Sequence, residues 1–181
     1  MVRCLDKTQN RLAIFLLKNN DFSEKTNKVI KRVQDHCTNI CYVCLSKPYA
    51  EVIDNLKNQR INHDNFTFVD TVSSPHYKLK PVNNCYFVQG LENLKDIKKT
   101  IQKAVKKNEC TAAIFDTIST LLIYQKTFDI VRFTHELITD EHQKDINKIF
   151  VILEEKGIYA KESKKLINDL NLFADKTFEI E

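Results

Sequence analysis

The stretch AAIFDTISTLL, residues 112–122, is a short apolar run that stops at Asp116 and continues with the small hydroxyl residues Thr117, Ser119 and Thr120. In a parallel sheet a buried strand delivers one carboxylate to its carboxyl end in this way, and that edge is where open α/β folds bind ligands. The stretch therefore predicts a buried parallel strand with Asp116 at the ligand-binding edge.

A glycine-rich phosphate loop is missing after the first predicted strand, residues 12–17. Nucleotide-binding α/β folds use such a loop to wrap the phosphates, while the strand-end carboxylate holds magnesium or its water. Here the segment NNDFSEKT follows the strand and ends in Lys25 and Thr26, where a phosphate loop has its Lys-Thr pair. Asn19 and Glu24 occupy the two glycine positions. A side chain crowds the phosphate cradle and a carboxylate repels phosphate, so backbone phosphate binding is not expected.

The composition fits one domain that spans residues 1–181. The chain is 43% hydrophobic and 29% charged, which is enough for a real core. The formal net charge is +4 and the basic residues are mostly lysine. Proteins that read nucleic-acid sequence rely on bidentate arginine, so we expect no nucleic-acid partner.

We expect a cytoplasmic protein with no membrane association. No apolar run approaches the ~20 residues of a membrane span, and the opening residues MVRCLDKTQN lack an apolar signal core. Six cysteines without a signal segment fit reduced, buried thiols better than a disulfide framework.

Apolar strand candidates alternate with amphipathic helical stretches along the whole chain, which is the pattern of a parallel sheet covered on both faces. The fold class is therefore α/β. Besides the strand that ends at Asp116, the strand candidates are residues 12–17, 40–45, 66–69, 85–88, 148–153 and 176–180.

This order of elements resembles the core of the RecA/KaiC-like ATPases. The segments YVCLSKPY and INHDNFTFVD, the run AAIFDTISTLLIYQ with RFTHEL after it, and the ending FADKTFEI carry the resemblance, which covers nearly the full chain. The chain is most similar to short archaeal members that have lost the phosphate loop. The resemblance implies a three-layer sandwich with a mostly parallel central sheet. It also implies that Asp116 orients magnesium and its water, and that Lys25 and Thr26 contact the β/γ-phosphates and the metal.

The chain departs from active members of that family at the end of the second predicted strand. Active KaiC-like members carry paired glutamates there, which activate the attacking water, whereas this chain has Leu45, Ser46 and Lys47. A protonated lysine cannot act as that base, and a serine without a partner base is too weak. We therefore expect no hydrolysis and no required cofactor, with weak binding of ATP and magnesium as the alternative.

Structural interpretations of the same residues remain open. Asp116 is also placed to cap the next helix, and Lys25 and Thr26 are also ordinary first-turn residues of a solvated helix. Asp70 ends another predicted strand, where it either joins Asp116 at the ligand edge or starts a turn.

A competing motif is the string CTNICYVC, in which Cys37, Cys41 and Cys44 have the C-x3-C-x2-C spacing of radical S-adenosylmethionine enzymes. Three thiolates from one loop can hold a four-iron cluster. Residues 40–45, however, are predicted to form a strand, in which Cys41 and Cys44 point to opposite faces. The iron–sulfur protein is therefore kept only as an alternative.

A lysine-rich helix offers a third class of function, because a basic face can track a nucleic-acid backbone. These lysines spread over about half of the helix circumference, and no aromatic residue is interleaved with them for base stacking. We therefore interpret them as a solvated helix surface. The lysines are Lys95, Lys98, Lys99, Lys103, Lys106 and Lys107.

The sequence thus favours a non-catalytic RecA/KaiC-like domain that acts in regulation or signalling by binding a protein partner or another copy of itself. The alternative is a switch in which Lys25, Thr26 and Asp116 still hold ATP without efficient turnover.

Overall fold

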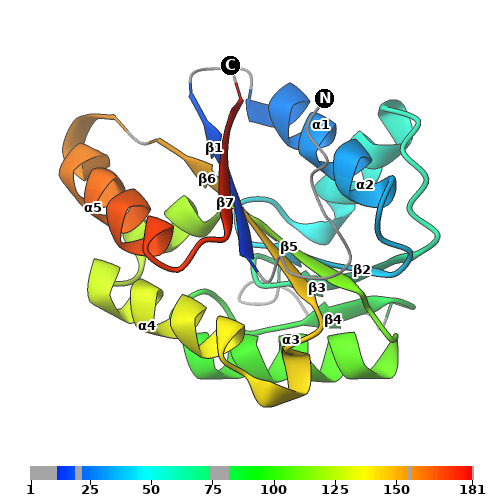
Figure 1. Cartoon of the computed structure of the whole chain (residues 1–181). Helices are drawn as coiled ribbons and strands as arrows, with labels where there is room; N and C mark the ends of the chain where they lie inside the picture. The colour runs from blue at the N-terminus through cyan, green and yellow to red at the C-terminus, as the bar shows by residue number, and fades with distance from the viewer. Residues whose placement is uncertain (1–11, 19–21, 74–81, 155, 181) are drawn as a thin grey trace.

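A parallel seven-stranded sheet forms the centre of the molecule. The computed structural model describes residues 12–18, 22–73, 82–154 and 156–180. The strands pair in the order β4-β3-β2-β5-β6-β1-β7, and every neighbouring pair is parallel (Figure 1). They are β1 (Leu12–Leu17), β2 (Ile40–Cys44), β3 (Phe66–Asp70), β4 (Cys85–Phe87), β5 (Ala112–Asp116), β6 (Asn147–Leu153) and β7 (Lys176–Ile180).

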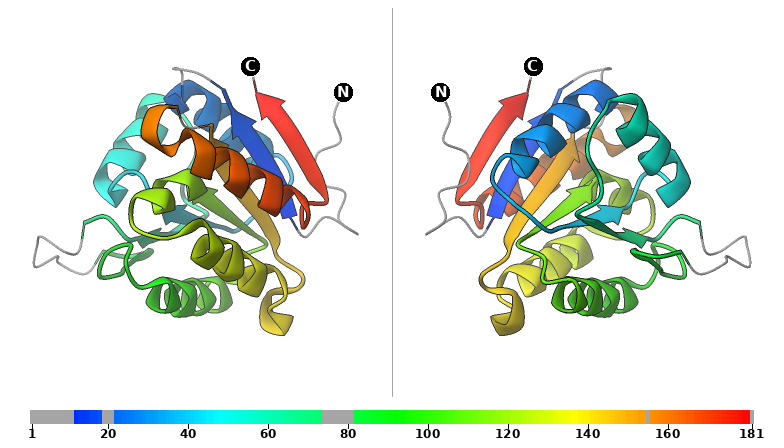
Figure 2. Two further views of the ribbon diagram at one scale, coloured as in Figure 1. Left: turned by 90° about the vertical axis from the view of Figure 1, so that its left-hand side faces the viewer. Right: turned by 90° about the vertical axis from the view of Figure 1, so that its right-hand side faces the viewer.

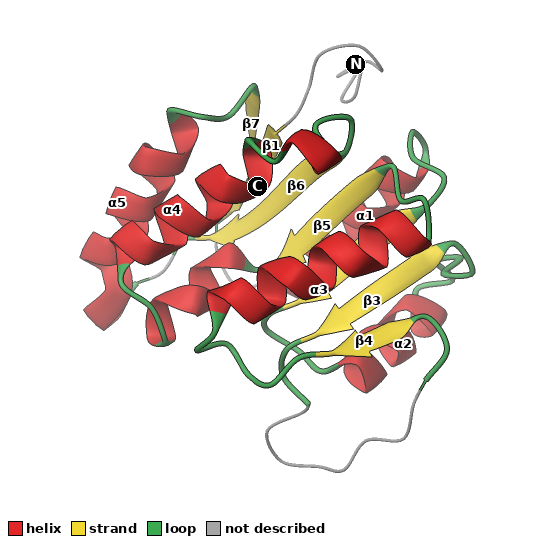
Figure 3. Ribbon diagram, turned by 90° about the horizontal axis from the view of Figure 1, so that it is seen from below, coloured by secondary structure: helices red, strands yellow, loops and turns green. Residues whose placement is uncertain are grey.

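Helices cover both faces of this sheet, so the architecture has three layers (Figure 2). One layer holds α1 (Phe22–Gln34) and α2 (Tyr49–Asn58), and the other holds α3 (Leu94–Lys107), α4 (Thr127–Ile138) and α5 (Ala160–Asn171). Figure 3 shows the second layer in front of the sheet. Short 3-10 helices are η1 (Ile118–Ile123), η2 (Glu141–Gln143) and η3 (Gly157–Tyr159).

Strand alternation divides the buried side chains into two cores. In β5, Ala113 and Phe115 pack toward α3, α4 and α5, whereas Ala112 and Ile114 pack toward α1 and α2. The Phe115 ring meets the Phe150 ring of β6 edge to face, with centroids 5.0 Å apart. Burial on both faces explains why the strand sequences are continuously apolar rather than alternating.

The chain connections place a crevice at the carboxyl ends of β2 and β5. These two strands are neighbours, but α2 follows β2 on one face, whereas η1 and α4 follow β5 toward the other face. Neighbouring strands whose connections leave on opposite faces open a crevice at their carboxyl ends, and ligands of open α/β sheets bind there. Asp116 ends β5 at this crevice.

The predicted fold class is confirmed, and β2, β3, β4 and β6 each differ from the predicted range by one residue at one end. Leu45 lies beyond β2 because its N–H and that of Ser46 both bond to the Asp116 carbonyl oxygen, at 2.8 and 3.1 Å, which ends the regular ladder. Asp70 belongs to β3, and β4 ends at Phe87. Within the described ranges, no helix has the length and apolar character needed to span a bilayer.

Candidate functional site

A small polar pocket lies in the crevice at the carboxyl edge of the sheet, between β2, β5 and the two helices α1 and α2. We call it the edge pocket. Its volume is about 10 Å³, which is the space of about one water molecule. The described residues that line it are Phe22, Ser23, Thr26, Tyr42, Lys47, Val52, Asn55 and Asp116.

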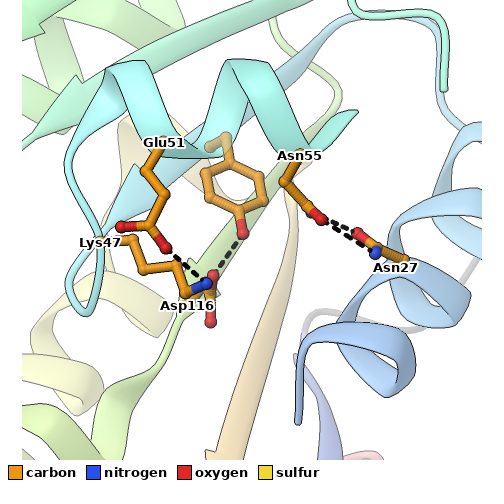
Figure 4. A network of polar contacts seen from close by, with 6 residues as sticks. Asn27, Lys47, Glu51, Asn55 and Asp116 are labelled. Carbon is orange, nitrogen blue, oxygen red and sulfur yellow. Dashed lines mark hydrogen bonds and ion pairs between the residues drawn. The ribbon is translucent and has the colours of Figure 1, made fainter. Parts of the chain in front are cut away.

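Asp116 reaches the edge pocket because it shares a face of the sheet with Tyr42. Asp116 pairs in register with Cys44, and Tyr42 lies two residues before Cys44 on the same face. The Tyr42 hydroxyl donates a hydrogen bond to Asp116 Oδ2 (Figure 4). Asp116 is 3% exposed, and its Oδ1 has no hydrogen-bond partner in the part of the chain that the structure describes.

Burial controls the protonation of this pair. It raises the pKa of Asp116 to about 6, and the hydrogen bond from Tyr42 and the charge of Lys47 oppose part of that rise. Burial, together with the nearby Asp116 charge, raises the pKa of Tyr42 well above its ordinary value. Tyr42 is therefore a hydrogen-bond donor at neutral pH, and the buried Asp116 carboxylate depends on that donor.

The predicted phosphate-contacting residues point to different places. The Lys25 side chain is buried, and its ammonium donates to the Lys18 carbonyl oxygen at the end of β1. Thr26 is also buried, lines the edge pocket, and has no partner for its Oγ1 among the described residues. Glu24 is exposed and pairs with Lys28 at 2.7 Å, and this contact lowers the pKa of Glu24. Asn19 lies outside the described residues.

Lys47, which follows the end of β2, forms a local ion pair. Lys47 Nζ lies 2.7 Å from a carboxylate oxygen of Glu51 on the next helix, α2 (Figure 4). Ser46 is half-buried, and its Oγ has no partner among the described residues. The carboxylate of Glu51 is thus held by a cation rather than aimed at Asp116, and none of these side chains is arranged as a general base.

Asp70 starts a turn and does not join Asp116. Its Oδ1 accepts hydrogen bonds from the N–H groups of Val72 and Ser73 at 2.8 and 3.0 Å. Its Oδ2 accepts from the Tyr49 N–H at 2.8 Å and from the Ser73 hydroxyl at 2.6 Å. With both oxygens engaged, this carboxylate anchors the turn after β3 and the first turn of α2.

An amide pair closes the wall of the edge pocket between α1 and α2. Asn55 Nδ2 donates to Asn27 Oδ1 at 2.8 Å, and Asn27 Nδ2 faces Asn55 Oδ1 at 3.4 Å (Figure 4). Asn27 is 4% exposed. The pair ties together the two helices that cover this face of the sheet.

The cysteine arrangement does not fit an iron–sulfur cluster. Cys41 packs in the core under α3, α4 and α5, whereas Cys37 and Cys44 pack in the core under α1 and α2. All three are buried free thiols. In the described ranges, no group of three His, Cys, Asp or Glu side chains is arranged to hold a metal ion.

Sequence reasoning did not identify Tyr42 and Asn55 as site residues. Tyr42 meets Asp116 only through the pairing of β2 with β5, two strands that are separated by more than sixty residues of chain. Asn55 meets Asn27 only after both helices dock on the same face. The strand order is the signal that was missing, because it fixes which strand ends are neighbours.

Comparison with known proteins supports the fold. The chain is similar in structure to a KaiC-like protein from the hyperthermophilic archaeon Pyrococcus horikoshii OT3, with a TM-score of 0.60 and 12% sequence identity. The match covers 95% of this chain and 74% of the other. No family model and no curated protein sequence matches the chain. At this identity the likeness establishes a KaiC-like fold and leaves the chemistry to the residues of the site.

Proposed function

We propose that this chain is a RecA/KaiC-like domain that does not hydrolyse ATP and that acts in regulation or signalling by binding another protein. The observation that carries the proposal is that two of the candidate site residues are already hydrogen-bonded to other groups of the protein. Tyr42 holds Asp116, and Lys25 holds the Lys18 carbonyl oxygen. The space left between the described residues accommodates about one water molecule.

Magnesium and a triphosphate do not fit the edge pocket in this conformation. The donor types are suitable, because Thr26 Oγ1 and Asp116 Oδ1 are buried oxygens without partners among the described residues, and Mg²⁺ prefers oxygen ligands. The volume of the pocket is too small, however. Mg²⁺ keeps several waters and bridges to phosphates, whereas the pocket measures about 10 Å³. No step of a mechanism is therefore assigned to the metal.

Exposed apolar side chains support a protein-binding role. Ile123 is 58% exposed, Tyr124 48% and Phe128 69%, and all three lie within six residues at the junction of η1 and α4. Large apolar groups that gather in solvent are typical of protein contact sites. The partner is another protein or a second copy of this chain.

Thermal unfolding of the reduced protein with and without millimolar Mg-ATP tests the non-catalytic proposal. A ligand that binds only the folded state stabilises it, by about 2.7 kcal/mol at a hundred times its Kd. We expect no shift in Tm and no phosphate release. A clear shift that Asp116→Ala abolishes would instead establish the second candidate, a nucleotide-binding switch. The two unpartnered oxygens of Thr26 and Asp116 favour that candidate, because a ligand that opened the pocket would satisfy both.

Sedimentation velocity tests whether the protein partner is a second copy of this chain. We expect self-association that Phe128→Glu weakens, because a buried charge opposes an apolar contact. The matched control is Leu172→Glu, since Leu172 is also highly exposed but lies at the far end of α5. A chain that is monomeric at all concentrations excludes the second copy as the partner.

A further inference from the structure

Four exposed lysines lie on the outer face of α3. Successive residues of an α-helix are 100° apart, so Lys99, Lys103, Lys106 and Lys107 share an arc of about 100°. We call this arc the lysine face. It lies opposite the buried positions of the helix, which include Ile101 and Ala104. Figure 3 shows α3 on the outside of the sheet.

The lysine face carries one carboxylate, Asp96, which lies on the same arc one turn before Lys99 and accepts a hydrogen bond from Asn93 Nδ2 at 2.7 Å. No ion pair joins these four lysines to any described residue, whereas Lys98 on the flank of the same helix pairs with Glu136 at 2.9 Å. Lys99 and Lys103, and Lys103 and Lys107, are like-charge pairs four residues apart, which destabilise a helix. From Lys99 to Lys107 the face is therefore a row of cations about 12 Å long that repel one another, and an external polyanion would relieve this repulsion.

An aromatic ring stands at the end of the lysine face. Tyr86 comes from the edge strand β4, and its ring centroid lies 6.0 Å from Lys103 Nζ and 5.9 Å from Lys107 Nζ. Asn108 Nδ2 donates to the Tyr86 hydroxyl at 3.3 Å and to the Ala104 carbonyl oxygen at 2.8 Å. No aromatic residue is interleaved with these lysines in the sequence, but the fold brings Tyr86 to them from β4.

Two hollows flank the same end of α3. One, of about 460 Å³, is bordered by Lys103, Lys106 and Glu109. The other, of about 430 Å³, is lined by Tyr86 and Lys107 together with Asn83, Asn84 and Asn108. These volumes lie within the range of small-molecule sites, about 300–1,000 Å³. Amide groups can both donate to and accept from the edge of a base.

We propose that the lysine face, Tyr86 and the second hollow bind single-stranded nucleic acid. The lysine face holds consecutive phosphates, and Tyr86 stacks a base whose edge meets the asparagine amides. Lysines act on phosphates as point charges, so the binding does not depend on sequence. The aromatic ring beside a polar hollow favours a nucleic acid over an acidic protein segment, which needs neither. This reverses the expectation from the sequence, and it revises the assignment of these lysines as a solvated surface.

The proposed site is separate from the edge pocket. The carboxyl end of α3 leads into the start of β5, so it lies at the amino edge of the sheet, opposite the edge where Asp116 lies. Failure of one proposal therefore leaves the other untouched.

Fluorescence anisotropy with a labelled oligothymidylate tests the proposal. We expect binding at low salt, with a slope of log K against log salt of about −3 for four neutralised phosphates on a single strand. The triple variant Lys99→Gln, Lys103→Gln, Lys107→Gln should bind about tenfold or more weakly and with a shallower slope. The matched control neutralises three exposed lysines of α5, namely Lys161, Lys164 and Lys165, and should keep most of the affinity.

Substitution of Tyr86 separates stacking from charge. Tyr86→Leu should bind about tenfold more weakly with an unchanged salt slope, because it loses the stacked base but keeps every phosphate contact. Tyr86→Phe keeps the ring and should keep the affinity. Circular dichroism of each variant checks that it is folded. Equal weakening by the α3 and α5 variants overturns the proposal. The proposal is also overturned if an oligoglutamate binds as tightly as the oligonucleotide and Tyr86→Leu has no effect. That result would identify the lysine face as a binding surface for an acidic protein.

Discussion

The Tyr42 hydroxyl and Asp116 Oδ2 are joined by a hydrogen bond that crosses from β2 to β5 inside the edge pocket. The fold thereby buries a carboxylate with one satisfied and one unsatisfied oxygen among the described residues. A buried charge with a single donor costs stability, and that cost appears as the raised pKa of Asp116. The protonation state of Asp116 thus links the pocket to the stability of the whole sheet.

The stability contributed by Asp116 should fall as pH rises from about 4 to about 6. Its folded pKa of about 6 exceeds the unfolded value of about 3.9, so folding favours the protonated form. The stabilisation is fully present below the unfolded pKa and is lost as pH rises through the folded pKa. The difference corresponds to about 3 kcal/mol. Asp116→Asn, which mimics the neutral carboxyl, should therefore be more stable than the wild type at pH 7 by up to about that amount, as measured by urea unfolding.

At pH 4 the difference in stability should disappear, because Asp116 is then protonated in the folded protein. Wild type and Asp116→Asn should have nearly equal free energies of unfolding at that pH. Asp54→Asn is the matched control, since Asp54 is an exposed carboxylate on α2 that does not line the edge pocket. A wild type that is more stable than Asp116→Asn at pH 7 would contradict the assignment and would indicate that something else stabilises the charge.

Removal of the Tyr42 hydroxyl should cost about 2 kcal/mol of unfolding free energy at pH 7.5, because a hydrogen bond to a buried charged group is lost. The loss should be smaller near pH 5, where Asp116 is largely protonated, because the hydrogen bond from Tyr42 favours the charged form. Tyr42→Phe is compared with Tyr49→Phe, because the Tyr49 hydroxyl makes no hydrogen bond to a described residue and its ring packs on the same core. Equal effects of the two substitutions at both pH values would refute the prediction.

The strands were predictable from the sequence because a parallel sheet covered on both faces needs apolar side chains in both directions. The residues of β1 and β7 are predicted without error, and β2 and β5 are predicted to within one residue. Their pairing is not encoded locally. The neighbours of β5 are β2 and β6. This strand order depends on the packing of α1 and α2 on one face of the sheet and of α3, α4 and α5 on the other.

The candidate site was predictable only in part. Asp116 was identified because a strand that ends in a carboxylate is a local pattern. Its contact with Tyr42 depends on the pairing of β2 with β5, whose residues are far apart in the sequence. The same is true of Tyr86, which lies more than fifteen residues before the lysines that it meets. Contacts of this kind require the tertiary structure.

The Asn27–Asn55 amide pair should couple α1 to α2 energetically. Each single substitution to Ala removes the interaction between the amides, so the double variant should lose less stability than the sum of the single variants. We expect a coupling energy of about 1 kcal/mol, the net value of an ordinary hydrogen-bonded pair. Chemical denaturation of the four proteins of the cycle measures it. Strict additivity would show that the two amides are independent in solution.

The described cysteines should be slow to react in the folded protein. Burial raises the pKa of the Cys37, Cys41 and Cys44 thiols, and it raises the pKa of Cys85 to about 12 and of Cys110 to about 11. Because the thiolate is the reactive form, iodoacetamide at pH 8 should modify each of them at least about tenfold more slowly than a thiol in the unfolded chain. Mass spectrometry of peptides from a time course gives the rate at each site.

The iron–sulfur alternative makes the opposite prediction for three of these thiols. Ligands of a labile cluster are thiolates that share one solvent-facing loop, so Cys37, Cys41 and Cys44 would become reactive together once the cluster is lost. The separation of Cys41 from Cys44 by the sheet instead predicts three independent, slow rates that become fast only when urea unfolds the protein. Joint rapid modification of the three in the absence of denaturant would contradict the fold at β2.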